Sequence, residues 1–270
     1  MDSKNVIKKI KEEFINKKED ILKIIELEKN NWDYKIDYDK LIGIFDKYEN
    51  KDEIINNDFK NTNEIVSGLG RVAIVNLTTP YSILSMILIS IRTSNNITFY
   101  LKDKLLAINT ILIEIASKIK NNISHINSNS YEDFYENQDS YNCVIYFGNK
   151  FEYLEFSRRL KIKSIFENSG EIFVFIDDRS FKDEFVSMDK FAYYNDINIR
   201  YYADNFDKAI KTINEFGIVK DSVIFTKNRD RAAKFLQEVK AENVYVNSNP
   251  CNNYGFDFDE SKLVYMKKMC

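Results

Sequence analysis

The chain has 270 residues, 44% of them hydrophobic and 30% charged, which is the balance of a soluble globular protein with room for one large domain or two smaller ones. Its formal net charge of −3 and its interspersed Lys, Asp and Glu residues exclude the strongly basic surface that nucleic acid selects. No apolar run approaches the ~20 residues of a membrane-spanning helix, and the charged N-terminus lacks the apolar core of a signal peptide. We therefore expect neither a nucleic-acid partner nor a membrane partner.

The cysteine pattern favours a reducing compartment. Cys143, Cys251 and Cys270 are odd in number and far apart, so they form neither a disulfide framework nor a metal-ligand spacing. The cytoplasm is the simplest location, and we expect no metal site.

The first 60 residues favour helices. Apolar residues recur at helical spacing over residues 3–30 and again over 38–48, and residues 52–60 form a third short helical piece. A partner-binding coiled coil is the alternative, but the apolar period is not sustained over enough heptads. We expect residues 1–60 to form an N-terminal helical segment that packs on the core and carries no chemistry.

The stretch from Gly70 to Lys102 predicts one βαβ unit. A strand follows Gly70 and ends at the polar turn Asn76–Thr79, Pro80 then opens a long apolar helix, and a second strand ends at Lys102. Such a unit implies a parallel sheet covered by helices, whose ligands bind at the carboxyl ends of the strands. The turn and Lys102 are therefore expected at the rim of a ligand site.

The rest of the chain continues the alternation of strands and helices. This pattern predicts an α/β fold with a Rossmann-like, mostly parallel sheet and helices on both faces. The expected elements are a helix at 105–119, a strand at 123–126, a loop or short helix at 131–137, a strand at 141–147, a helix at 150–160, strands at 164–166 and 171–176, a helix at 181–191, a strand at 197–202, a helix at 206–216, a strand at 222–225, a helix at 230–240 and strands at 243–246 and 262–269.

Several of these pieces together resemble the aldehyde dehydrogenase superfamily, including its glutamyl phosphate reductase relatives. The Gly70–Lys102 unit resembles the first βαβ unit of that family's cofactor domain, and residues 201–247 resemble a late part of its catalytic domain. The other similar pieces are Tyr146-Phe147-Gly148-Asn149, the run from Phe166 to Gly170 with the following Asp177-Asp178, and the final strand VYMKKM. They occur in family order over most of the chain.

The resemblance implies a division into a Rossmann-like cofactor region at 61–179 and a shortened, catalytic-domain-like α/β region at 180–270 with a C-terminal strand. It implies NAD or NADP as the cofactor. The residues that it assigns to cofactor binding are Asn76, Thr78, Thr79, Lys102, Gly148 and Asn149. The family's last strand often joins an oligomerisation sheet, so the resemblance also implies a homodimer or association with a full-length family member.

The departures from the family concern catalysis first. Family chains are much longer, and the segment that carries their nucleophilic cysteine is reduced here to residues 179–196, which contain no cysteine. The chemistry needs a thiolate that attacks the aldehyde or acyl carbon, and amide donors for the oxyanion. Cys251 and Glu167 are the remaining weak candidates. Cys251 lies in a turn without an adjoining His or basic cluster, and Glu167 matches a family glutamate but has no nucleophile to activate.

The cofactor motifs are eroded as well. Leu105 stands where the family has an acid, Asn149 replaces a serine, and Tyr153 replaces a glycine that lets the backbone approach the pyrophosphate. We therefore predict weak or lost cofactor binding and a catalytically inactive protein with a binding, regulatory or structural role. The competing hypothesis is an NAD(P)- or nucleotide-binding enzyme, similar to an oxidoreductase or acyl reductase, that retains a degenerate cofactor site.

Three further features have a structural interpretation. Asp177 and Asp178 end a strand, which suits a catalytic pair, but capping of the next segment is the favoured interpretation. Cys143 lies within a strand and is expected in the core. His125 is the only histidine of the chain, and a structural role is favoured over catalysis.

Overall fold

The computed structural model divides the chain into two compact units, each built around its own parallel sheet. The first contains residues 1–147, 151–167 and 256–270, and the second contains residues 148–150 and 168–255. The boundaries predicted after residues 60 and 179 follow composition and motif order, whereas these units follow packing. The structure describes residues 2–31, 36–51, 64–77, 79–101, 107–127, 130–148, 150–168, 171–181, 188, 198–202, 205–216, 219–248 and 258–268.

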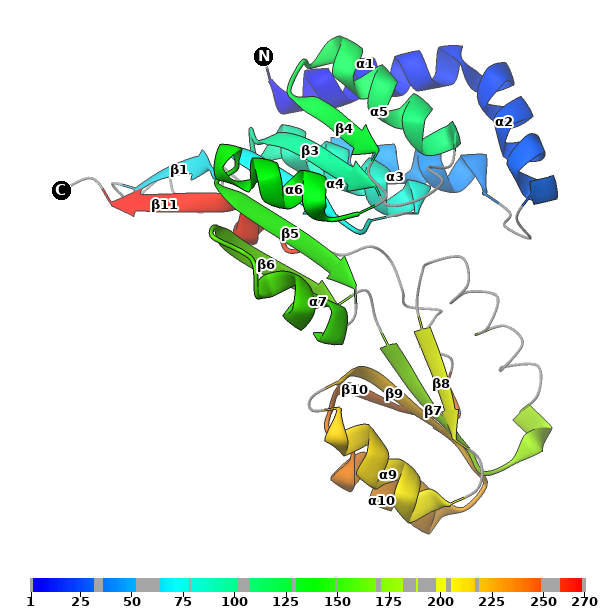
Figure 1. The fold of residues 1–270 in the computed structure, drawn as a ribbon. Coiled ribbons are helices and arrows are strands. Elements are labelled where there is room, and N and C mark those ends of the chain that lie inside the picture. Colours follow the sequence, from blue (N-terminus) through cyan, green and yellow to red (C-terminus); the bar gives the residue numbers. More distant parts are fainter. Residues whose placement is uncertain are drawn as a thin grey trace. The chain divides into compact units, whose positions relative to one another are not determined.

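A five-stranded sheet forms the centre of the first unit, in the order β4-β3-β2-β5-β6 (Figure 1). β2 is the middle strand and runs parallel to both neighbours, with Ile74 opposite Phe99 of β3 and Ile145 of β5. The strands are β2 (Arg71–Val75), β3 (Asn96–Leu101), β4 (Ile123–Asn127), β5 (Cys143–Gly148) and β6 (Lys163–Asn168).

Helices cover both faces of this sheet, which confirms the predicted α/β arrangement. One face carries a mainly aromatic cluster in which Val75 and Tyr146 pack against Phe134 of α6 and Phe156 of α7. α4 and α5 cover the other face, and α1, α2 and α3 pack on them. The helices are α1 (Ser3–Asn16), α2 (Lys18–Asn31), α3 (Tyr38–Asn50), α4 (Pro80–Arg92), α5 (Ala107–Ile119), α6 (Glu132–Asn137), α7 (Lys150–Ser157) and the short 3-10 helix η1 (Gln138–Ser140).

The inward face of α2 differs from the simple apolar pattern. Ile21 and Ile25 are buried, but Leu22 and Leu27 are 42% and 65% exposed. The next inward position is taken by Glu28, which is only 7% exposed. Helical spacing places residues 21, 25 and 28 on one face, so the charged residue rather than Leu27 continues the buried stripe.

The C-terminal segment returns to the first unit. β11 (Val264–Lys268) pairs antiparallel with β1 (Glu64–Gly68), and the two form a ribbon seen in cyan and red in Figure 1. A short 3-10 helix, η4 (Glu260–Leu263), precedes β11. Buried Asn95 ties this segment to the sheet, because its amide nitrogen donates to the Leu263 carbonyl at 2.9 Å while its oxygen accepts from the Gly70 amide at 2.9 Å.

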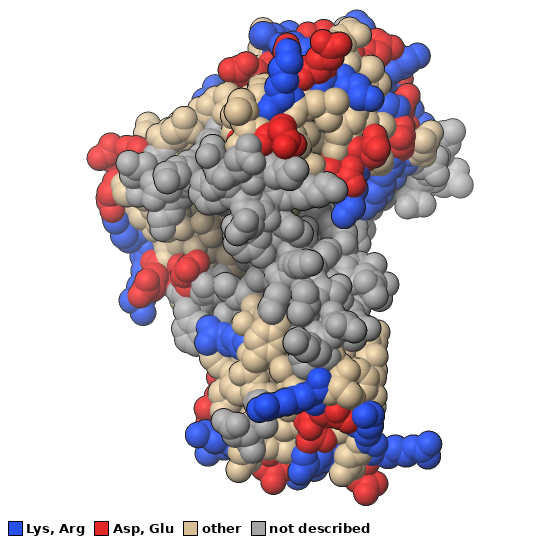
Figure 2. All heavy atoms as spheres, turned by 90° about the vertical axis from the view of Figure 1, so that its right-hand side faces the viewer, with Lys and Arg blue, Asp and Glu red and all other residues tan. Residues whose placement is uncertain are grey.

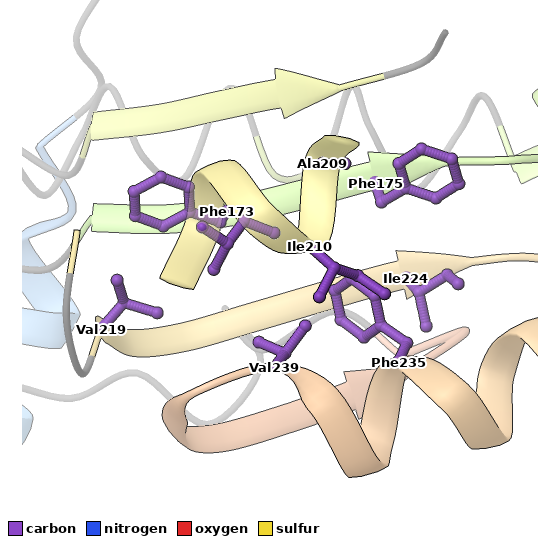
Figure 3. Packing of buried hydrophobic residues seen from close by; sticks show 9 residues of the cluster. Phe173, Phe175, Ala209, Ile210, Val219, Ile224, Phe235 and Val239 are labelled. Atoms are coloured by element: carbon purple, nitrogen blue, oxygen red, sulfur yellow. The ribbon is translucent and has the colours of Figure 1, made fainter. Parts of the chain in front are cut away.

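The second unit contains a four-stranded parallel sheet in the order β10-β9-β7-β8. α9 and α10 pack on one face of it through the apolar cluster of Figure 3, in which Phe173 and Phe175 of β7 lie beside Ile210 and Phe235 of the two helices. The elements are β7 (Glu171–Ile176), η2 (Arg179–Phe181), β8 (Asn198–Tyr202), α9 (Phe206–Glu215), β9 (Val219–Phe225), α10 (Arg229–Glu238) and β10 (Ala241–Val246).

The surface mixes positive and negative charges. On the face shown in Figure 2, Lys and Arg side chains alternate with Asp and Glu among the described residues. In the part of the chain that the structure describes, no helix is both long and apolar enough to cross a membrane.

Candidate functional site

The strand order of the first unit reverses between β2 and β5. From β2 the chain proceeds outward through β3 and β4 on one side, and it then returns to β5 and β6 on the other. In open α/β sheets, ligands bind outside the carboxyl ends of the strands at such a reversal. This edge is therefore the candidate site, and the sequence predicts Asn76 and Gly148 at it.

Asn76 bridges the reversal. Its backbone is left-handed, with a φ of 65°, which asparagine tolerates better than most residues. Its side-chain Nδ2 donates to the carbonyl oxygen of Phe147 at 2.8 Å. Gly148 follows directly and has a φ of 153°, a conformation that side chains disfavour. The fold thus brings Asn76 to the end of β5, and the Asn76 amide is engaged by that strand.

Thr79 serves as the cap of α4. Its Oγ1 accepts from the backbone amide of Ser82 at 3.2 Å and donates to the Ser82 hydroxyl at 2.7 Å. Pro80 occupies the first turn, where its missing amide is not needed. The threonine is buried, so its hydroxyl stabilises the start of α4.

Of the other site residues predicted from the sequence, most lie outside the part of the chain that the structure describes. Thr78, Lys102, Asn149 and Cys251 lie outside the described residues. Glu167 is described, and its carboxylate pairs with Lys262 at 2.5 Å. This pair links the end of β6 to the C-terminal segment, which gives Glu167 a structural partner.

Tyr153 lies in the aromatic cluster between α7 and the sheet. Its ring stacks on Phe166 with centroids 4.6 Å apart, and its hydroxyl lies 2.8 Å from the Ser164 hydroxyl. The ring also contacts Tyr146. The side chain that replaces the expected glycine is therefore part of the packing between α7, β5 and β6.

Sequence reasoning missed Glu28, which lies at the amino end of α5. Its carboxylate accepts a hydrogen bond from the Ala107 amide, the first residue of that helix. Burial raises the pKa of Glu28 above its ordinary value, although hydrogen bonds from the amides of Ala107 and Ile108 oppose the change. The sequence signal that could have revealed Glu28 is its spacing, because helical periodicity places this acidic residue on the same face as the apolar Ile21 and Ile25.

Cys143 is a core residue of β5, as expected from its sequence. It is completely buried, and burial raises the pKa of its thiol to about 11. The thiolate is the reactive form of cysteine, so this environment disfavours nucleophilic chemistry at Cys143.

Asp177 and Asp178 act as structural acceptors in the second unit. Asp178 accepts from the Ser180 amide at 2.8 Å and pairs with Lys227 at 3.0 Å. The Ser180 hydrogen bonds, followed by Lys227, lower the pKa of Asp178 to about 2. The Asp177 carboxylate accepts hydrogen bonds from the Thr226 hydroxyl and from the Arg231 guanidinium. Both acids therefore hold the carboxyl ends of β7 and β9 in place.

The described residues do not fit NAD or NADP as they stand. The Asn76 amide is taken by Phe147, the Thr79 hydroxyl by Ser82, and the first amide of α5 by Glu28. A dinucleotide needs free donors at such an edge for its phosphates and hydroxyls. In the described part of the chain, no group of three or more His, Cys, Asp or Glu residues could hold a metal ion.

Comparison with known sequences gives a short match to a curated enzyme. No family model matches the chain. A curated γ-glutamyl phosphate reductase from Halothermothrix orenii is 48% identical over 46 residues, which are 17% of this chain and 11% of the reductase. The matched segment therefore spans a small part of that enzyme.

Solved structures share the fold over nearly the whole chain. A probable aldehyde dehydrogenase from Listeria monocytogenes has a TM-score of 0.67 at 11% identity, covering 99% of this chain and 91% of its own. The γ-glutamyl phosphate reductase from Thermotoga maritima has a TM-score of 0.57 at 13% identity, covering 92% and 83%. The likeness confirms that the chain has the fold of aldehyde dehydrogenases and γ-glutamyl phosphate reductases.

Proposed function

We propose that the protein is a catalytically inactive aldehyde dehydrogenase-like protein with a binding, regulatory or structural role. One observation carries the proposal: the described polar groups at the ligand edge are engaged by the chain itself. Asn76 binds Phe147 across the strand reversal, and Thr79 caps α4 through Ser82. In addition, residues 179–196 contain no cysteine.

The chemistry explains why these features matter together. Oxidation or reduction at an acyl carbon in this family proceeds through attack by a thiolate, which forms a covalent intermediate. The only described cysteine, Cys143, is buried and has a raised pKa. A chain with this environment at Cys143 and no cysteine in residues 179–196 has lost the ordinary nucleophile.

An activity assay tests the proposal. Purified protein is incubated with NAD or NADP and a panel of aldehydes, and in the reverse direction with NADH or NADPH and acyl phosphates. We expect no change in reduced cofactor above a protein-free control. Cofactor turnover that disappears in Cys251→Ser and persists in Cys270→Ser would refute the proposed inactivity.

The alternative is a nucleotide-binding enzyme with a degenerate site. It is favoured by the strand reversal itself and by the positive φ of Gly148 at the end of β5. Calorimetric titration with NAD, NADP, ATP and coenzyme A distinguishes the two. Saturable heat that is lost in Asn76→Leu supports the alternative, and no response to any of the four ligands removes it.

Association through the β1–β11 ribbon is the partner mode that we propose. Two-stranded ribbons are marginal alone, and each exposes an unpaired edge that favours addition of a further strand. Tyr265 on β11 is 42% exposed. We expect a homodimer, or a complex with a full-length relative, that Tyr265→Asp weakens. Tyr201→Asp is the control, because Tyr201 is 38% exposed on β8 in the other unit.

Light scattering after size exclusion measures this association. A monomeric wild-type chain that also fails to co-purify with a relative from its native cell would contradict it. The three widely spaced cysteines support a cytoplasmic location, which localisation of a tagged chain in that cell tests.

A further inference from the structure

The residues from Phe258 to Lys268 form a segment that packs on the first unit, to which the chain returns after residue 255. The segment contains η4 and β11. Phe258, Glu260 and Leu263 are buried within it, whereas Asp259 and Lys262 are exposed. We call residues 258–268 the strap. Its contacts show what the strap covers and what holds it in place.

The first residue of the strap lies at the ligand edge. The Phe258 ring packs against the Phe147 ring, with the centroids 6.3 Å apart. Phe147 is the residue near the end of β5 whose carbonyl accepts from Asn76. Lys262 lies over the Phe258 ring, and its ammonium group pairs with Glu167 near the end of β6 at 2.5 Å. The strap therefore covers Phe147 at the carboxyl end of β5.

The later residues of the strap are attached to the chain just before β2 and β3. The Leu263 carbonyl accepts from the Leu69 amide at 3.1 Å and from the Asn95 side-chain nitrogen at 2.9 Å. β11 then pairs with β1. The acceptor of the Leu69 amide belongs to the strap, so this amide loses its hydrogen bond when the strap moves away.

A buried ion pair holds the strap between these two attachments. Glu260 Oε2 lies 3.0 Å from Arg92 Nε, and Glu260 Oε1 lies 2.6 Å from Lys51 Nζ. The Arg92 guanidinium also donates to the Lys51 carbonyl at 2.9 Å, which joins the strap to the end of α3. Separation of a buried pair leaves charges without compensation, so it is costly. The pair therefore opposes detachment of the residues on both sides of Glu260.

We propose that the strap opens and closes as one unit over the carboxyl end of β5 and that the Arg92–Glu260 pair is its lock. Its other attachments are weak, because a two-stranded ribbon is marginal and the Lys262–Glu167 pair is partly exposed. Opening therefore requires less free energy than unfolding of the whole unit. This inference deepens the proposed binding role and rests on it, because it states what controls access to the ligand edge. Association through the β1–β11 ribbon would hold the strap closed, so a partner and an edge ligand would oppose each other.

Native-state hydrogen exchange of the full-length chain, followed by NMR at a series of low urea concentrations, measures the opening. The Leu69 amide reports the strap. The Asn142 amide, which donates to the Arg71 carbonyl at 2.8 Å, reports the central sheet. After correction for intrinsic rates, we expect Leu69 to exchange at least about tenfold faster than Asn142. Its exchange should also depend less on urea, because the urea slope follows the surface that opening exposes.

Two variants of the strap and one control test the lock and the cover. Glu260→Gln keeps the shape of the side chain but removes the charge that faces Arg92, and Phe258→Ala removes the ring that covers Phe147. Each should accelerate exchange at Leu69 at least about tenfold, because each removes a contact made only in the closed form. Glu132→Gln is the matched control. It breaks the exposed pair with Arg159 elsewhere in the first unit, so exchange at Leu69 should not change.

Equal urea slopes for Leu69 and Asn142 in the wild type overturn the proposal, because the strap would then open only with the whole unit. This outcome does not depend on the folding of any variant. Unchanged exchange at Leu69 in Glu260→Gln removes the lock, and unchanged exchange in Phe258→Ala shows that the edge contact opens separately, so either result also overturns the proposal. These measurements are independent of the dehydrogenase assay. Cofactor turnover would refute the proposed inactivity without changing the exchange at Leu69.

Discussion

Asn247 binds the backbone of Thr226 with both ends of its carboxamide. Its Oδ1 accepts from the Thr226 amide and its Nδ2 donates to the Thr226 carbonyl, both at 2.8 Å. Asn247 itself has a left-handed φ of 49°, and its backbone amide donates to the Ile224 carbonyl. The side chain therefore joins the carboxyl ends of β9 and β10.

Replacement of Asn247 should separate the two roles of this residue. Asn247→Gly loses both hydrogen bonds but adopts the left-handed backbone without strain, and we expect a loss of about 1–3 kcal/mol in the free energy of unfolding. Asn247→Ala loses the same bonds and adds about 1 kcal/mol of backbone strain. Urea unfolding measures the free energy of unfolding, which should decrease in the order wild type, Asn247→Gly, Asn247→Ala. An alanine variant as stable as the glycine variant would show that the backbone is not strained.

Gly68 and Gly43 differ in the space that a side chain would find at each position. A Cβ on Gly68 would lie 2.4 Å from the Thr93 carbonyl oxygen and 2.9 Å from Asn95 Oδ1, whereas a Cβ on Gly43 would meet nothing within 4 Å. Gly68→Ala should lower the free energy of unfolding by about 1–3 kcal/mol, because backbone must move. Gly43→Ala, within α3, should raise it by about 0.5–1 kcal/mol. Thermal unfolding of both variants checks the signs. A stabilised Gly68→Ala would show that the Gly68 backbone is free to shift.

A buried ion pair attaches the C-terminal segment to α4. Glu260 Oε2 lies 3.0 Å from Arg92 Nε, and the two side chains are 5% and 1% exposed. Arg92→Met leaves the buried Glu260 carboxylate with only the partly exposed Lys51 as a charged partner. It also removes the hydrogen bonds that Arg92 donates to the Tyr48 and Lys51 carbonyls, so it should lower the free energy of unfolding by about 3–5 kcal/mol. Lys51→Met is the control. Lys51 also pairs with Glu260, but its side chain is 42% exposed, and we expect a loss below about 1 kcal/mol.

The double variant Arg92→Met with Glu260→Met refines the comparison. Because it removes both charges, it should be less destabilised than the sum of the two single variants. Chemical denaturation of the four proteins gives the coupling energy. Strict additivity would indicate that the pair contributes no interaction of its own.

The pH dependence of stability should report Glu28. Burial raises the pKa of Glu28 in the folded chain, so its protonated form is favoured by folding. Its contribution is complete below the ordinary glutamate pKa and is lost as the pH rises through the raised value. Glu28→Gln does not titrate, and it keeps an acceptor for the Ala107 amide.

The stability of Glu28→Gln relative to the wild type should therefore increase from acidic to neutral pH. Urea unfolding at a series of pH values measures this difference. Glu19→Gln, on the exposed face of α2, should show no comparable change. A relative stability that falls with rising pH would mean that the α5 amides outweigh burial and lower the pKa of Glu28.

Local sequence patterns were sufficient for the fold class. The Gly70–Lys102 stretch predicted a βαβ unit, and β2, α4 and β3 occur within it. Apolar strand runs, a Thr-Pro helix start and Asn breaks act over a few residues, so they are visible without tertiary information. The same holds for the terminal strand, which was expected at 262–269 and is β11 at Val264–Lys268.

The candidate site was predictable only in part. The sequence placed Asn76 and Gly148 at strand ends, and their common edge followed from parallel topology. The hydrogen-bond partner of Asn76 could not be predicted from the sequence, because Phe147 is 71 residues away and the bond depends on how β2 and β5 pack side by side. Thr79 was assigned to a cofactor through resemblance, but its hydroxyl also has a local use as a helix cap, which its position before Pro80 favours.

The sequence by itself determined most of the alternation of strands and helices, because hydrophobic periodicity and turn residues are local properties, but it did not reveal β1 (Glu64–Gly68). Only the tertiary structure decided which polar groups are buried and with what partners. Glu28 on α2 meets an amide 79 residues away, and Asn95 meets a carbonyl 168 residues away. Such pairs depend on the packing of distant elements, and a buried polar group stays in place only where that packing satisfies part of its hydrogen-bonding capacity.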